Sequence, residues 1–186
     1  QLNTIRQAAI QKIRTGYSAH VMIPEIISLY ENHTKIKIME KNVMSLDTNI
    51  NVTTPSDSKS HLTVLFVHFG EDWIRGSEVC LINLVTNIKK IGIKPLVWCN
   101  SEVLYQELKR RNIAVKKNHF TVLLGWERPR FNILNFGRLI RTAGKIIQQQ
   151  KVDVIHTNSG APNQWMLIEA RKTSTPILTQ LHAPYL

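Results

Sequence analysis

The chain has 186 residues, of which 43% are hydrophobic and 20% charged, so its composition is that of a globular protein rather than a disordered or fibrous one. This length accommodates one well-cored domain with an appendage and excludes two full-sized α/β domains. The formal net charge of +11 predicts an anionic partner, either a nucleotide, lipid headgroups or nucleic acid.

The first part of the chain differs in texture from the rest. Residues 1–45 are predicted to form a helical N-terminal extension, because their apolar residues recur at helical spacings and Gly16 and Pro24 interrupt the pattern. Residues 46–61 are rich in Ser, Thr, Asn and Asp, which is the composition of a linker. We therefore expect the main domain to occupy residues 62–186.

Apolar runs typical of strands alternate with helical patterns from residue 62 onward. Strands are predicted at 62–68, 95–99, 113–115, 120–124, 152–157 and 176–181, and helices at 77–91, 101–111, 132–149 and 162–172. This alternation predicts βαβ units, and the nearly continuous apolar runs predict parallel strands buried on both faces. The expected fold class is α/β with an open, doubly wound parallel sheet.

Two helices carry clear apolar stripes that would dock them on the sheet. In the helix 77–91 the stripe is Leu81, Leu84, Val85, Ile88 and Ile91, and in the helix 132–149 it is Phe136, Leu139, Ile140, Ala143, Ile146 and Ile147. Gly92 is predicted to end the first of these helices.

The loop GEDWIRGSE, residues 70–78, joins the first strand to the first of these helices. Ligands of open α/β sheets bind beyond the carboxyl ends of the strands, and the amides around Gly76, Ser77 and Glu78 would suit a phosphate. Alternatively, Ser77 is a helix cap and Glu78 only complements the helix dipole. The G-x-G-x-x-G and P-loop motifs are both missing from the sequence, which disfavours those two kinds of nucleotide site.

Three stretches, taken in order, resemble one family. The strand TVLFVHFG with its loop and helix, the run VDVIHTNSG and the run PILTQLHAP together resemble the N-terminal domain of retaining GT-B glycosyltransferases of family 4. The resemblance covers roughly residues 62–186. It implies a Rossmann-like, acceptor-side domain whose first glycine loop approaches the pyrophosphate of a nucleotide-sugar donor.

The resemblance also assigns roles to individual residues. It places Arg75, Gly76, Ser77 and Glu78 at the donor phosphates, and His182 beside the reacting sugar as a hydrogen-bonding catalytic residue rather than a nucleophile. The family more often has two adjacent glycines before the acidic residue, and here Arg75 replaces the first. Arg75 would then supply a cation to the phosphate or point to solvent.

Polar residues also follow the strand predicted at 152–157. Asn158 and Ser159 would contact the acceptor sugar, or would only turn the chain. His68 ends the first predicted strand and reads as a core histidine with its hydrogen bonds satisfied.

Basic residues concentrate in the second half of the chain. Between Lys109 and Lys151 the sequence holds eleven basic residues and one acidic residue, Glu127. Around the helix predicted at 132–149, the basic residues are Arg128, Arg130, Arg138, Arg141 and Lys145. Such a surface would contact anionic lipid and bring the protein to a membrane-bound acceptor, or would be a solvated basic face.

The sequence predicts no metal site, no cofactor and no disulfide framework, since its two cysteines lie in a predicted helix and at a strand end. This cysteine usage fits a reducing cytoplasm, with peripheral contact at the membrane. The runs of apolar residues are far shorter than the roughly 20 that a transmembrane helix needs.

The resulting hypothesis is the N-terminal part of a glycosyltransferase that transfers a sugar from a nucleotide-sugar donor to a glycan or lipid-linked acceptor, with retention. In the family the second domain carries a Glu-x7-Glu pair, and no two glutamates here have that spacing. We therefore expect the donor-binding domain to be absent and this chain alone to be inactive. The alternatives are a non-catalytic interaction module of the same fold and a nucleic-acid-binding domain, for which no recognisable motif is present.

Overall fold

A computed structural model describes residues 28–29, 62–122 and 132–181 of the chain. The chain divides into two compact units, Gln1–Ser58 and Lys59–Leu186, and the second holds all the strands described below. The predicted helical extension and linker lie almost wholly outside the described residues and stay predictions.

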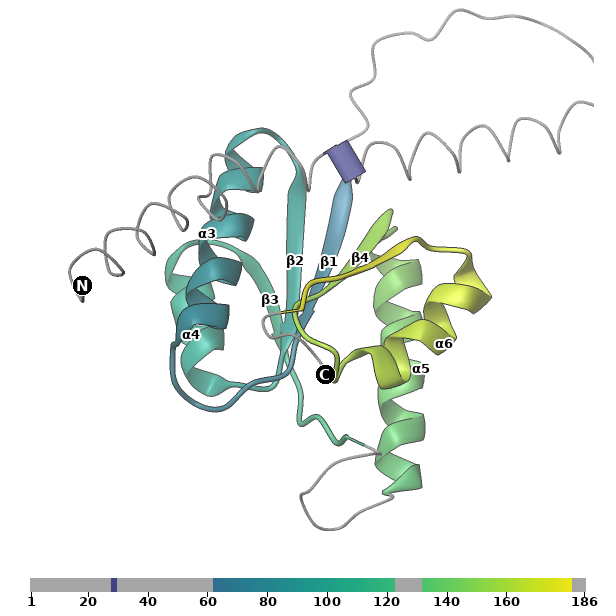
Figure 1. Cartoon of the computed structure of the whole chain (residues 1–186). Coiled ribbons are helices and arrows are strands. Elements are labelled where there is room, and N and C mark those ends of the chain that lie inside the picture. The colour runs from purple at the N-terminus through teal and green to yellow at the C-terminus, as the bar shows by residue number, and fades with distance from the viewer. Residues whose placement is uncertain (1–27, 30–61, 123–131, 182–186) are drawn as a thin grey trace, which may run out of the picture. The chain divides into compact units, whose positions relative to one another are not determined.

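Strands and helices alternate along the second unit (Figure 1). The strands are β1 (Thr63–His68), β2 (Lys94–Cys99), β3 (Ala114–Lys117), β4 (Val154–Thr157) and β5 (Ile177–Thr179). The helices are α3 (Gly76–Lys90), α4 (Glu102–Arg110), α5 (Ile133–Gln149) and α6 (Asn163–Thr173).

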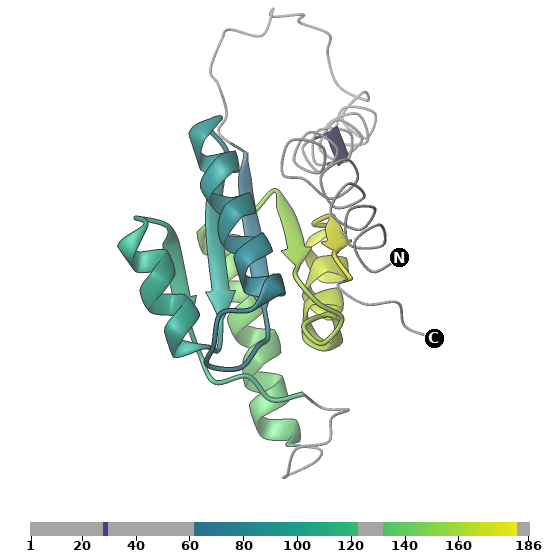
Figure 2. The ribbon, with the colours of Figure 1, turned by 60° about the vertical axis from the view of Figure 1, so that its left-hand side comes forward.

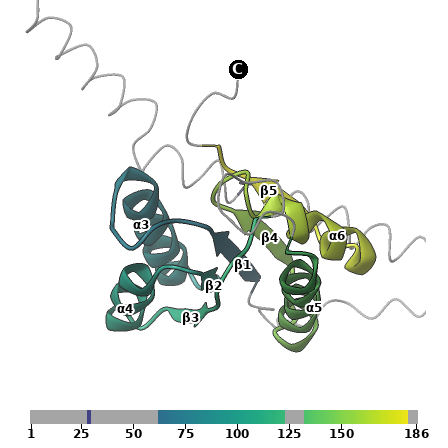
Figure 3. The same cartoon turned by 90° about the horizontal axis from the view of Figure 1, so that it is seen from below.

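The five strands form one parallel sheet of order β3-β2-β1-β4-β5. The chain therefore runs outward from β1 to β3, crosses back, and runs outward again on the other side of β1. Because crossovers between parallel strands are right-handed, the two directions place their helices on opposite faces. Figure 3 shows this arrangement, with α3 and α4 on one face and α5 and α6 on the other. The prediction of a doubly wound α/β fold is confirmed.

The central strand β1 is buried at all six positions, as expected for a parallel strand covered by helices on both faces. Its residues alternate between the two layers. Leu65 and Val67 pack into a core with Trp98 and Ile155 and with the apolar stripes of α5 and α6. The predicted stripe of α5 is confirmed, with four members buried and Phe136 and Ile140 packed against them.

The strand predicted at 120–124 is wrong for the part that is described, because residues 120–122 form no strand. Phe120 instead packs edge-on against Trp98 and Trp165, at centroid distances of 4.9 and 5.1 Å. The apolar character of this stretch therefore reflects the burial of one aromatic ring rather than sheet pairing. The strand predicted at 113–115 is confirmed as β3, displaced toward its two lysines.

The end of α3 corrects one further expectation. The helix ends at Lys90, so Ile91 is its C-cap and is exposed rather than docked on the sheet. Gly92 has a φ of 89°, a left-handed conformation that glycine adopts without strain, and the chain turns there as predicted.

The start of α5 projects past the carboxyl ends of the strands (Figures 1 and 2). Two apolar residues of its first turn, Ile133 and Leu134, are 71% and 90% exposed. Within the described ranges, no helix combines the length and apolar character needed to cross a membrane.

The two cysteines are both free thiols but differ in environment. Cys99 ends β2 and is buried, and this burial raises the pKa of its thiol to about 12. Cys80 lies on the exposed side of α3.

Candidate functional site

The carboxyl ends of β1 and β4 lie side by side in the sheet, and the chain leaves them toward opposite faces. After β1 the chain turns into α3 on one face, and after β4 it turns into α6 on the other. Asn158 follows β4, and its backbone N–H donates to the Val67 carbonyl oxygen at 2.9 Å. Open α/β sheets bind their ligands at such a switch point, so this edge is the candidate site.

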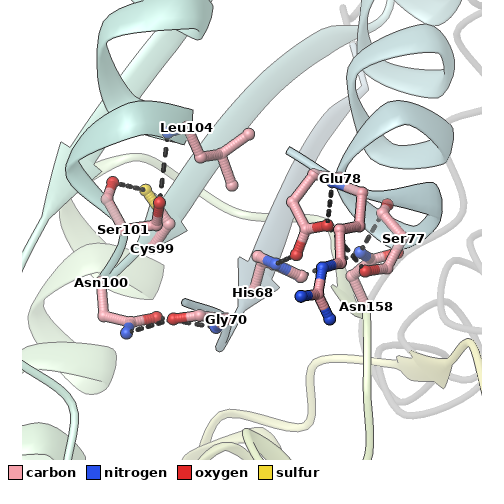
Figure 4. Close-up of polar contacts among 10 residues, drawn as sticks. His68, Gly70, Ser77, Glu78, Cys99, Asn100, Ser101, Leu104 and Asn158 are labelled. Carbon is pink, nitrogen blue, oxygen red and sulfur yellow. Dashed lines mark hydrogen bonds and ion pairs between the residues drawn. The ribbon is translucent and has the colours of Figure 1, made fainter. Parts of the chain in front are cut away.

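A buried polar network joins β1, α3 and β4 at this edge (Figure 4). His68 Nε2 lies 2.8 Å from Glu78 Oε1, and the Asn158 side-chain amide lies 2.9 Å from His68 Nδ1 and donates to the Ser77 carbonyl oxygen at 3.3 Å. The three side chains are nearly inaccessible, with exposures of 2% for His68, 4% for Glu78 and 0% for Asn158. The prediction that His68 is a core histidine with satisfied hydrogen bonds is confirmed.

The network fixes the proton positions on its members. The NH₂ group of Asn158, which can only donate, also donates to the Ser77 carbonyl oxygen, so His68 Nδ1 is the acceptor and Nε2–H donates to Glu78. Burial would raise the pKa of the Glu78 carboxyl, but hydrogen bonds from the backbone amides of Glu78 and Arg75, from the Ser77 hydroxyl and from His68 lower it. The net pKa lies below the ordinary value, so Glu78 is an ionised carboxylate inside the protein.

Glycine is needed at position 70 because the network occupies the space that a side chain would fill. A Cβ added there would lie 2.5 Å from His68 Nε2 and 2.9 Å from Glu78 Oε1. The backbone of Gly70 is held from the other side by Asn100, which donates to its carbonyl oxygen at 2.7 Å and accepts from its N–H at 3.0 Å (Figure 4). The beginning of the loop is therefore tied to the ends of both β1 and β2.

The middle of the loop is held by Asp72, whose carboxylate accepts the backbone N–H of Glu102 at 2.7 Å in the first turn of α4. Beyond this anchor the loop reaches solvent. Trp73 is exposed, and the Arg75 guanidinium lies over its ring at 3.8 Å from the centroid. Stacking of this kind orients a cation beside the start of α3.

The first turn of α3 presents unused donors. Arg75 is the N-cap, and its own N–H is taken by Glu78 Oε2 at 3.0 Å. Within the described residues, the amides of Gly76 and Ser77 donate to no acceptor. Gly76 is exposed, and an added Cβ there would meet nothing within 4 Å, so its side-chain position faces open space. Free amides at a helix start carry a partial positive charge that attracts phosphate.

A second polar cluster holds the ends of β4 and β5. The Thr157 hydroxyl donates to Asn163 Oδ1 at 2.8 Å, and the Asn163 amide donates to Thr179 Oγ1 at 2.9 Å. On the other face of the same strands, His156 Nε2 lies 3.1 Å from Gln180 Oε1. These contacts fix the start of α6 and the strand end that leads toward residue 182.

The predicted site residues fall into separate places. The four predicted at the donor phosphates lie together at the start of α3, with Arg75 and Gly76 exposed and the Glu78 carboxylate turned inward. Asn158 is adjacent but buried in the network, and Ser159 follows it with a buried hydroxyl that has no hydrogen-bond partner among the described residues. His182, Arg128 and Arg130 lie outside the described residues. Arg138, Arg141 and Lys145 lie on α5, whose packing against the opposite face of the sheet separates them from α3.

The sequence did not predict the anchoring roles of Asn100, Asp72 and Gly70. Asn100 directly follows β2, so a polar residue at a strand's carboxyl end was the available signal. Among the described residues, no group of three His, Cys, Asp or Glu side chains is placed to hold a metal ion.

The sheet order and the open helix start at its switch point define a Rossmann-like α/β domain. The sequence profile of Glycosyltransferase Family 4 matches residues 74–186, more than half of the chain. The chain therefore belongs to glycosyltransferase family 4, and the resemblance to the N-terminal domain of a GT-B enzyme is confirmed.

Solved glycosyltransferases share this fold. The glycosyltransferase from Rickettsia africae ESF-5 aligns with a TM-score of 0.55 and 22% identity, over 68% of this chain and 31% of its own. MurG from Acinetobacter baumannii aligns with a TM-score of 0.50 and 16% identity, over 63% of this chain and 34% of its own. Likeness at these identities shows the fold alone, and this chain spans roughly a third of either enzyme. No curated protein sequence matches the chain.

Proposed function

We propose that the chain is the acceptor-side part of a glycosyltransferase that transfers a sugar, with retention, from a nucleotide-sugar donor to a glycan or lipid-linked acceptor. Membership of a glycosyltransferase family supports the reaction class. We propose in addition that the donor is a nucleotide sugar, that the acceptor is a glycan or lipid-linked sugar, and that the transfer retains the anomeric configuration. In this proposal, the first turn of α3 binds the pyrophosphate of the donor.

One observation carries the proposal, namely the pair of open amides at Gly76 and Ser77. When the sugar leaves, negative charge grows on the departing diphosphate, and fixed N–H donors stabilise that charge without reorganising. An exposed carboxylate in the same turn would repel the phosphates. The Glu78 carboxylate is instead turned inward, where both its oxygens accept hydrogen bonds, so it does not occupy the surface at these amides.

Arg75 completes the positive surface in this proposal. Its guanidinium is exposed and held over Trp73, one residue before the open amides. A guanidinium binds phosphate oxygens through several N–H groups at once. Arg75 therefore supplies a cation at this position, where a glycine would supply none.

Ser159 is the better acceptor contact of the two predicted residues. The Asn158 side chain already donates to His68 and to the Ser77 carbonyl oxygen, whereas the buried Ser159 hydroxyl has no hydrogen-bond partner in the part of the chain that the structure describes. A buried hydroxyl left unpaired is unfavourable unless a ligand or water completes it. Ser159→Ala should therefore weaken acceptor binding and leave donor binding unchanged.

The test is a titration of the 186-residue chain with UDP-glucose, following backbone amide resonances. We expect shifts at Gly76, Ser77 and Glu78. Gly76→Leu adds a bulky side chain beside these amides without a clash, so binding should weaken by about tenfold or more while the melting temperature stays unchanged. Cys80→Leu is the control, because Cys80 is also exposed on α3 but lies beyond the first turn of the helix.

The proposal fails if Gly76→Leu binds UDP-glucose as tightly as the unaltered chain. It also fails if the shifts appear only on α5 and spread with added DNA. That second result would favour the nucleic-acid alternative, whose binding falls steeply with salt.

A further inference from the structure

Residues of α5 and α6 line an open groove of about 430 Å³. Both helices lie on the face of the sheet opposite α3 (Figure 3). The residues that line the groove are Gly137, Ile140, Arg141, Gly144, Lys145, Gln148, Glu169 and Lys172. The volume lies within the range of about 300–1,000 Å³ typical of small-molecule sites. The groove is separate from the switch point and takes no part in the function proposed above.

Two glycines of α5 shape the groove. A glycine inside a helix costs about 1 kcal/mol relative to alanine, so each needs a reason. At Gly144 the reason is packing, because an added Cβ would lie 2.6 Å from Glu169 Oε2. At Gly137 packing gives no reason, since an added Cβ would meet nothing within 4 Å. Gly137 leaves one part of the groove open to an approaching group.

The groove carries an excess of positive charge. Arg141 and Lys145 lie one helical turn apart on α5, where two like charges repel each other. Neither forms an ion pair within the described residues, and α5 contains no acidic residue. Lys172 adds a third cation from α6, and its ammonium pairs with Glu169 at 2.7 Å. The lining therefore has three cations and one anion.

We propose that this groove binds a phosphate-bearing anion through Arg141, Lys145 and Lys172. Arg141 and Lys145 have no acidic partner among the described residues, so an anionic ligand would stabilise them through charge-assisted hydrogen bonds. Lys172, already paired with Glu169, adds a third donor at the edge of the cluster. The groove is larger than a bare phosphate, so the ligand carries a further group that lies in the groove toward Gly137. Gln148 and Glu169 provide polar contacts for hydroxyls on that group.

The phosphate has two possible sources, a soluble phosphate ester or the headgroup of an anionic lipid. Ile133 and Leu134 favour the lipid, because they are exposed apolar side chains at the start of the same helix. Basic residues beside exposed apolar residues are typical of surfaces that lie on anionic membranes. The experiment has one arm for each source.

In the first arm, the 186-residue chain is titrated with inorganic pyrophosphate and backbone amides are followed. In the second arm, the chain is mixed with vesicles containing phosphatidylglycerol and with vesicles of phosphatidylcholine alone. We expect saturable binding that maps to α5 and α6 in one or both arms, and weaker binding as salt is added. Because amide shifts are assigned residue by residue, pyrophosphate bound at Gly76 is told apart from pyrophosphate in the groove.

Two variants test the residues. The double substitution Arg141→Ala with Lys145→Ala should weaken binding by about tenfold or more. Its control, Lys90→Ala with Lys116→Ala, removes two exposed positive charges from elsewhere in the domain and should leave binding unchanged. Both pairs leave the same net charge, so a general attraction of the basic protein for anions would affect them equally.

Gly137→Leu separates a binding role from a structural one. The leucine enters open space and improves helix propensity, so the melting temperature should stay the same or rise. Binding in the groove should nevertheless be lost, while Gly76→Leu should leave it intact. The proposal is overturned if neither probe binds between α5 and α6, if both double variants weaken binding equally, or if Gly137→Leu binds normally.

Discussion

Two glutamates of this domain lie against a glycine, and the structure uses them differently. Glu78 is 4% exposed beside Gly70, and Glu169 is 7% exposed beside Gly144. Both oxygens of Glu78 accept hydrogen bonds from groups within ten residues of it, whereas Glu169 has Lys172 on one oxygen and no described partner on the other. A buried carboxylate whose two oxygens both accept hydrogen bonds holds the surrounding elements together. A buried carboxylate with a free oxygen can still bind a ligand.

Alanine at the two glycines should give the largest contrast. Gly70→Ala forces a methyl group against His68 and Glu78, which other contacts hold in place, and should lower the free energy of unfolding by about 1–3 kcal/mol. Gly144→Ala displaces only the end of Glu169 and gains about 1 kcal/mol of helix propensity, so it should be nearly neutral. Urea denaturation of both variants measures the difference, and equal destabilisation would contradict the comparison.

Neutralising the two carboxylates should give a smaller contrast. Glu78→Gln replaces an acceptor oxygen with an NH₂ group that faces N–H donors, so unfolding should become about 1.5–3 kcal/mol easier. Glu169→Gln removes only its pairing with an exposed lysine, which is worth at most about 1 kcal/mol. A cost for Glu169→Gln as large as that for Glu78→Gln would show that Glu169 is also needed for folding.

The pH dependence of stability should show the smallest effect. The pKa of Glu78 is lower in the folded chain than its ordinary value of 4.5, so the folded state binds this proton less readily than the unfolded state. The stabilisation is therefore complete above pH 4.5 and is lost as the pH falls through the folded pKa. Stability of the unaltered chain should fall more steeply in acid than that of Glu78→Gln, and parallel curves would contradict the lowered pKa.

The sheet was predictable from the sequence because its signals are local. The apolar runs of β1, β2 and β4 and the stripe of α5 gave the order of elements and the α/β class. Phe120 gave a false strand because hydrophobicity records burial and not the partner, and its partners are the rings of Trp98 and Trp165. Ile91 was misplaced because the helix ends one residue before it.

The place of the candidate site in the fold was predictable from the sequence, but the contacts of its residues were not. A loop between a buried strand and an amphipathic helix identifies the open amides of Gly76 and Ser77. The inward turn of Glu78 depends on His68, ten residues earlier, and through it on Asn158, ninety residues beyond His68. Contacts over such separations leave no pattern in a single sequence. The α5–α6 groove was missed for the same reason, because Lys172 joins Arg141 and Lys145 only in the folded chain.

The position of Asn158 has a consequence for the order of folding. The segment from β1 to β3 already contains His68, Glu78 and Asn100, so most of the loop after β1 can assemble from contacts that are close in sequence. Asn158 arrives only when β4 adds to the far side of β1, which closes a loop of ninety residues and is slow. We therefore expect His68 Nδ1 to gain its Asn158 donor late in folding, after both halves of the sheet have joined.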